Sequence, residues 1–81
     1  MDRALIWYIL TRLNFEIEYT KKEAIKTGIN FDEWIATLVN LMVRITDGDI
    51  TFPEFETMMT SYDTNDANLI LRDIRDAFPG L

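Results

Sequence analysis

The chain has 81 residues, 48% of them hydrophobic, which gives one small domain with one hydrophobic core and excludes a disordered chain. It has no cysteine and no histidine, so disulfides, thiolate zinc sites and Ser-His or Cys-His nucleophile pairs are excluded. The formal net charge of −6 argues against binding to nucleic acid and favours a basic partner or a cation.

Residues 3–13 are predicted to form the first helix. Its apolar run, Ala4 to Leu10, is much shorter than the ~20 residues that span a bilayer, and no signal-peptide cleavage site follows it. We therefore expect a helix buried on most sides, a cytoplasmic protein and no membrane partner. Residues 14–19 alternate in polarity, which predicts a short extended piece. Thr20, with Glu23 three residues later, then resembles a capping box for a short helix that ends at Gly28.

The clearest helix is predicted over residues 31–43. Asn30 would cap it, with Glu33 three residues later. Its apolar residues recur at helical spacing on one stripe: Phe31, Trp34, Ile35, Leu38, Val39 and Met42. Residues 46–49 (Thr-Asp-Gly-Asp) are typical of a turn, and residues 50–52 are predicted to be extended.

Two more helices are predicted in the second half of the chain. The first covers residues 54–62 and places Phe55, Met58 and Met59 on one side. Residues 63–66 (Asp-Thr-Asn-Asp) would break it and cap the last helix, which runs to about Phe78. The fold class predicted from these elements is all-α, with four or five helices.

One motif in the chain has a specific layout: a helix, an acidic glycine turn, an isoleucine and a second helix, as in an EF-hand. With Glu54 at position 12 of the twelve-residue loop, Asp47, Gly48, Asp49 and Ile50 fall at positions 5, 6, 7 and 8 without a gap. Glycine at position 6 allows the sharp turn, and a carboxylate at position 12 can give two oxygens to an ion.

The segment 49–59 closely resembles the end of the second EF-hand of the calmodulin-like family, and the similarity continues at residues 63–64 and 74–78. The resemblance implies a single lobe over residues 1–81, with a degenerate hand at about 1–28, a better-matched hand at about 30–62 and a C-terminal helix at about 65–78. It also implies a short two-stranded β-ribbon between the two loops, in which Ile17 pairs with Ile50. In character the chain is closest to a myosin-type light chain.

The candidate loop departs from the family pattern in its calcium ligands. Positions 1 and 3 fall on Val43 and Ile45, which have no oxygen to offer. Asp47, Asp49 and Glu54 remain as metal ligands, whereas calcium takes 6–8 oxygens. We therefore expect no cofactor and an unoccupied calcium site.

The resemblance implies that the lobe grips an amphipathic helix in a groove lined by methionines. The candidate partner-binding residues are Leu38, Met42, Phe55, Met58, Met59 and Phe78. Residues 43–81 hold eight of the fourteen acidic side chains but three of the eight basic ones, which favours a basic target helix. The expected function is that of a light chain or adaptor that binds a basic, IQ-like helix, such as that of a myosin neck, independently of calcium. The chain would act as a monomer or as a hand-to-hand dimer.

Three alternatives remain open. The six partner-binding side chains can instead form a closed core. The chain can be a weak calcium sensor or buffer despite its degenerate loop. It can also be an acidic inhibitor that mimics nucleic acid. An enzyme is not expected, because the paired carboxylates Glu16/Glu18 and Asp47/Asp49 are interpreted as loop residues and no catalytic residue is assigned.

Overall fold

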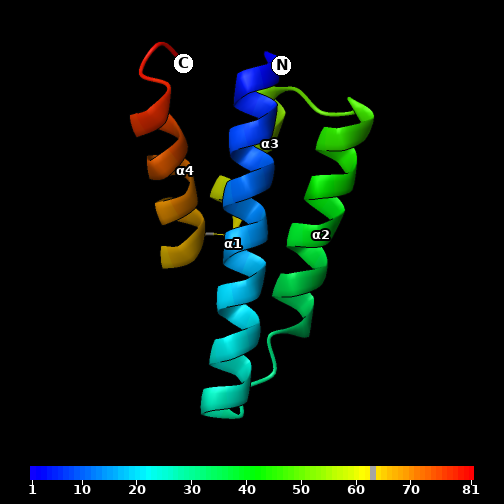
Figure 1. Cartoon of the computed structure of the whole chain (residues 1–81), viewed down its shortest axis with the longest axis vertical. Helices are drawn as coiled ribbons and strands as arrows, with labels where there is room; N and C mark the ends of the chain where they lie inside the picture. Colours follow the sequence, from blue (N-terminus) through cyan, green and yellow to red (C-terminus); the bar gives the residue numbers. More distant parts are fainter. Residues whose placement is uncertain (63) are drawn as a thin grey trace.

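The computed structural model describes residues 1–62 and 64–81, and these form four α-helices (Figure 1). The helices are α1 (Arg3–Thr27), α2 (Asp32–Asp47), α3 (Phe52–Ser61) and α4 (Asn65–Ala77). Helix α1 is central: α2 packs antiparallel on one side of it, α4 lies on the other side, and α3 lies behind α1 and packs on α4. The lower ends of α1 and α2 project beyond the lower end of α4.

All four helices contribute to one hydrophobic core, together with the turn between α2 and α3. The buried apolar residues are Leu5, Ile9, Leu13, Ile17, Leu38, Leu41, Ile45, Ile50, Phe52, Phe55, Met59, Ala67, Ile70 and Ile74. They recur at intervals of three and four within each helix, which places them on the side that faces the other helices. The all-α class predicted from the sequence agrees with this architecture.

Helix α1 is one continuous helix of 25 residues, so the predicted extended piece at 14–19 and the capping box at Thr20 are wrong. Leu13, Glu16, Ile17 and Thr20 all lie on its buried side, because they follow helical spacing. Burial against the neighbouring helices outweighs the local strand-like alternation. The predicted end of this helix is confirmed: Gly28 has φ 72°, the left-handed conformation that glycine adopts at low cost.

The predicted β-ribbon is also wrong. The described residues contain no strand, since Ile17 lies inside α1 and Ile50 lies in the turn before α3. Helix α2 continues past Val43, where we had placed the start of an EF-hand loop, and ends only at Gly48, which has φ 75°. Gly48 therefore ends a helix by the same left-handed geometry as Gly28.

The N-termini of the helices agree in part with the predicted caps. Thr64 caps α4, where its Oγ1 accepts a hydrogen bond from the amide of Ala67 at 3.1 Å. Asp63, the first residue of the predicted break, lies outside the described residues. Asn30 does not occupy the cap position of α2, but its Oδ1 accepts a bond from the amide of Asp32 at 2.8 Å, so it still holds the start of that helix.

The apolar run at the start of α1 is buried over most of its circumference. Leu5 and Ile9 face the core, Ile6, Tyr8 and Leu10 pack partly against it, and Trp7 is 66% exposed. The predicted burial on most sides therefore agrees with the structure except at Ala4 and Trp7. Within the described part of the chain, no helix combines the length and the apolar character needed to cross a membrane.

Candidate binding surface

The six residues predicted to bind a partner do not form one accessible groove. Leu38, Phe55 and Met59 are fully buried in the core. Met42, Met58 and Phe78 are partly buried at its margin. Leu38, Phe55 and Met59 thus belong to a closed core, which is the alternative that the sequence left open. A partner can reach these three side chains only if the helices separate.

The partly exposed residues among the six lie on different sides of the bundle. The ring of Phe78 packs edge to face on the ring of Tyr8 in α1, with 5.6 Å between the ring centroids. The sulfur of Met58 accepts a hydrogen bond from Nη1 of Arg44 in α2, at 3.3 Å. Phe78 thus closes the junction of α4 with α1, and Met58 closes that of α3 with α2.

The predicted calcium ligands have other structural roles. Asp47 is the last residue of α2, and Asp49 lies in the turn that follows Gly48. Glu54 belongs to a capping box at the start of α3, where its Oε1 accepts bonds from Oγ1 of Thr51 at 2.8 Å and from the amide of Thr51 at 3.1 Å. These hydrogen bonds stabilise the carboxylate and lower the pKa of Glu54. Over residues 1–62 and 64–81, no three acidic side chains lie close enough together to hold a metal ion.

The structure instead exposes an apolar surface that the sequence interpretation missed. Trp7 and Phe15 on α1 are 66% and 64% exposed, and they lie two turns apart. Val39 and Val43 on α2 are 46% and 52% exposed and lie one turn apart. We call these four residues the apolar face.

One charged side chain of α1 borders the apolar face: the guanidinium carbon of Arg12 lies over the ring of Phe15, 5.8 Å from its centroid. Between Arg3 and Glu18 the only charged residues are Arg12 and Glu16, and these turn toward the core and α4. Arg12 donates from Nε to Oδ2 of Asp73 at 2.8 Å and from Nη1 to Oε1 of Glu16 at 3.1 Å. The solvent side of this part of α1 therefore carries small, polar uncharged or aromatic residues.

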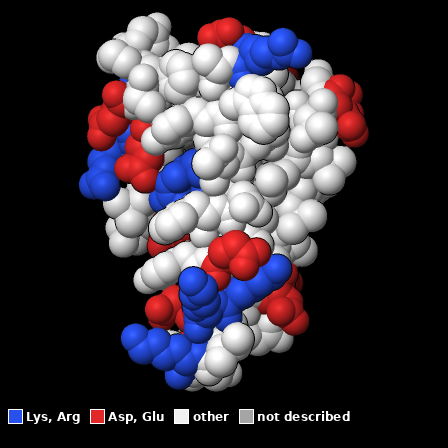
Figure 2. All heavy atoms as spheres, viewed as in Figure 1, with Lys and Arg blue, Asp and Glu red and all other residues white. Residues whose placement is uncertain are grey.

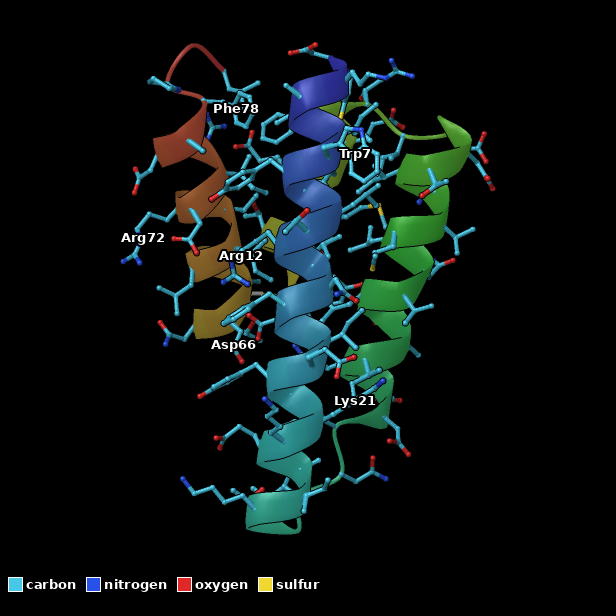
Figure 3. The ribbon with its side chains drawn as sticks, in the orientation of Figure 1. Trp7, Arg12, Lys21, Asp66, Arg72 and Phe78 are labelled. Atoms are coloured by element: carbon cyan, nitrogen blue, oxygen red, sulfur yellow. The ribbon has the colours of Figure 1, made fainter. Side chains whose placement is uncertain are left out.

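Figure 2 shows an uncharged area in the upper part of the front of the molecule, with charged groups at the top, at both edges, left of the centre and in the lower part. Trp7 lies high on α1, on the flank toward α2 (Figure 3). Beside it, Tyr8, Thr11, Arg12 and Phe15 line a shallow hollow of about 220 Å³. The apolar face is thus not flat, and Arg12, which is paired with Asp73, borders it beside Phe15.

Acidic side chains of α4 flank this surface. The hydrogen bond between Asp73 and Arg12 shows which side of α4 faces α1. Asp66 lies seven residues before Asp73 and Asp76 three residues after it, so both follow the same side, and both are exposed. The apolar face therefore has carboxylates along its α4 border.

One sequence signal for the apolar face was present. Residues 4–15 contain a single charged residue, Arg12, although one side of the helix must face water. A helix that lacks charges on its solvent side indicates a contact surface.

Comparison of the chain with protein-family models gave no match, and comparisons with curated proteins and with solved structures gave no significant match.

Proposed function

We propose that this chain is a non-enzymatic protein-binding adaptor that holds a basic amphipathic helix without calcium. The observation that carries the proposal is the exposure of Trp7 and Phe15 on a side of α1 whose one charged neighbour, Arg12, is already bonded to Asp73 and Glu16. Aromatic residues dominate the energetics of protein interfaces, and a partner that covers them removes apolar area from water, which is worth about 25 cal/mol per Å².

The charge distribution supports a basic partner. The apolar side of a target helix would cover the apolar face, and its Lys or Arg residues would lie beside Asp66 and Asp76 of α4. The net charge of −6 also speeds the encounter with a basic partner at low salt.

Independence from calcium is supported by the turn between α2 and α3. The side chain of Glu54 is already bonded to Thr51, and Asp47 is part of a helix, so an ion would have to displace a capping box and unwind the end of α2. Binding at the apolar face needs neither change, because these side chains are exposed in the bundle as it stands.

The test is an NMR titration of the ¹⁵N-labelled protein with a synthetic basic amphipathic peptide, with calcium and then with a chelator. We expect the amide signals around Trp7, Phe15, Val39 and Val43 to shift equally in both conditions. Trp7→Gln and Phe15→Gln should each weaken binding at least about fivefold, as expected of interface aromatics.

Ile25→Gln is the matched control, since Ile25 is an apolar residue of the same helix, is 86% exposed and lies outside the apolar face. It should leave the affinity unchanged. Shifts confined to the amide signals of the core residues Leu38, Phe55 and Met59 would show that the partner enters an opened bundle, and the apolar face would then not be the binding surface. Binding that appears only with calcium would contradict the proposal.

A further inference from the structure

A second recessed site lies away from the apolar face. The lower parts of α1 and α2 project past α4, and the segments that meet there leave a pocket of about 170 Å³. It is lined by Tyr19, Thr20, Glu23, Phe31, Trp34 and Asp66. Three of these residues come from α1, two from the start of α2 and one from the first turn of α4.

The lining combines three aromatic rings with two carboxylates. The rings belong to Tyr19, Phe31 and Trp34, and the carboxylates to Glu23 and Asp66. Among the described residues, neither Glu23 nor Asp66 takes part in an ion pair. Aromatic faces attract a cation through the ring quadrupole, and an unpaired carboxylate adds direct attraction.

Trp34 is a fixed wall of the pocket. Its indole is held in place by an edge-to-face contact with Tyr62, with 5.6 Å between the ring centroids. The ring therefore offers a cation a preorganised aromatic surface.

We propose that this pocket binds an organic cation, an alkylammonium or guanidinium group, between the three rings and the two carboxylates. The volume of about 170 Å³ suits one such group. The cation can belong to a free small molecule or to a lysine or arginine side chain, since both present the same chemistry. The site shares Asp66 with the α4 border of the apolar face, but its aromatic rings are separate from that face and its binding of a cation does not depend on the adaptor role.

The two tryptophans of the chain allow a direct test, because each gives its own indole N–H signal in an NMR spectrum. The full-length protein is titrated with tetramethylammonium chloride, and separately with the N-acetyl methylamides of lysine and arginine. Sodium chloride at equal ionic strength is the reference. We expect a saturable shift of the Trp34 indole signal, while the signal of the distant Trp7 stays in place.

Variants of the two carboxylates and an uncharged analogue show whether the ligand binds through its positive charge or only through its apolar bulk. Asp66→Asn and Glu23→Gln should each weaken binding by about two- to fivefold, the scale of a partly exposed charge interaction. Asp2→Asn removes the same charge at a helix N-terminus at the opposite end of the molecule and should change nothing. 3,3-Dimethyl-1-butanol, the neutral isostere of choline, has the bulk of a trimethylammonium group without its charge and should not bind.

Binding of tetramethylammonium alone would identify a free small cation as the ligand, and binding of the lysine or arginine derivative alone would identify a side chain. The proposal is overturned if no cation gives a saturable Trp34 shift, or if the neutral isostere binds as well as the ammonium ion. If the adaptor proposal fails, the amphipathic peptide leaves the Trp7 signal unchanged. If the cation-pocket proposal fails, the cations leave the Trp34 signal unchanged, so the two failures can be distinguished.

Discussion

Arg12 joins α1 to α4 through carboxylates that are themselves largely shielded. Its side chain is 14% exposed and that of Glu16 is 6% exposed. Burial alone would lower the pKa of Arg12, but hydrogen bonds to Asp73 and Glu16 outweigh it and raise the pKa above its usual value. A raised pKa gives stability that is fully present below the unfolded value and is lost only as the pH rises past it. The contribution of Arg12 is therefore constant at any pH at which the protein is handled.

Arg12→Met is expected to cost about 3 kcal/mol of unfolding free energy, because it leaves the carboxylate of Glu16 buried without its partner. The double variant Arg12→Met/Glu16→Leu should recover most of that loss, since Asp73 can still reach water. Urea unfolding of the wild type, both single variants and the double variant gives the coupling energy. Equal instability of Arg12→Met and the double variant would show that Glu16 does not need the ion pair.

Glu54 makes the start of α3 sensitive to acid. Its hydrogen bonds from the side chain and amide of Thr51 lower its pKa below 4.5. A lowered pKa gives stability that is present above the unfolded value and is lost as the pH falls through the folded one. Thermal stability should therefore fall below about pH 4.5, in part because protonated Glu54 no longer accepts both bonds.

Glu54→Gln isolates this effect, since glutamine can still complete a capping box but does not titrate. Thermal melts of the two proteins between pH 3 and 7 should diverge above about pH 4.5 and converge below it. Parallel curves over the whole range would mean that another acidic group causes the acid sensitivity. Thr51→Ala, which removes the other half of the box, should cost about 1 kcal/mol at neutral pH.

At the scale of the elements, the continuity of α1 is the largest departure from what the sequence predicts. Glu18 is exposed and lies in the middle of the segment that we expected to be extended. Glu18→Pro should cost about 3 kcal/mol or more, because proline removes a helix hydrogen bond and clashes with the preceding turn.

Arg3→Pro is the matched control, because it places proline at the first position of the same helix, where no intrahelical amide bond is lost. Circular dichroism and urea unfolding should show a large loss of stability for Glu18→Pro and little change for Arg3→Pro. A well-folded Glu18→Pro variant would mean that residues 14–19 do not need to be helical.

The sequence predicts three of the four helices with ends that differ from the structure by a few residues. The apolar stripe of α2 and the left-handed glycine after α1 carry unambiguous local signals. Residues 14–19 do not: Phe15, Ile17 and Tyr19 alternate with polar residues as in a strand, although only Ile17 of the three is buried. The choice between helix and strand is made there by packing against α2 and α4, which local periodicity does not contain.

The apolar face and the aromatic pocket could not be predicted from the sequence for a related reason. A groove that binds a helix and a closed core need the same apolar spacing, so Leu38, Phe55 and Met59 could not be assigned to one or the other. The apolar face and the aromatic pocket depend on which side chains remain uncovered. That is decided by where α4 ends relative to α1 and α2.

At the scale of the whole molecule, the long axis of 39 Å matches the length of α1, along which the other helices pack. Because every helix contributes to one core, removal of one central side chain should weaken the entire bundle. Leu13→Ala is expected to cost about 3 kcal/mol, since Leu13 is fully buried in the middle of α1. Val43→Ala, at an exposed position of α2, should stay within about 0.5 kcal/mol of the wild type.

Two probes decide whether the bundle unfolds as one unit. Circular dichroism reports all four helices, whereas the indole signal of Trp34 reports the contact with Tyr62, which joins α2 to the end of α3. For one cooperative core, both probes should give the same urea midpoint in the wild type and should move together in Leu13→Ala. A Trp34 transition that precedes the loss of helix would instead show that α3 and α4 detach from an α1–α2 hairpin that stays folded. That detachment would expose Phe55 and Met59, which are fully buried in the closed bundle.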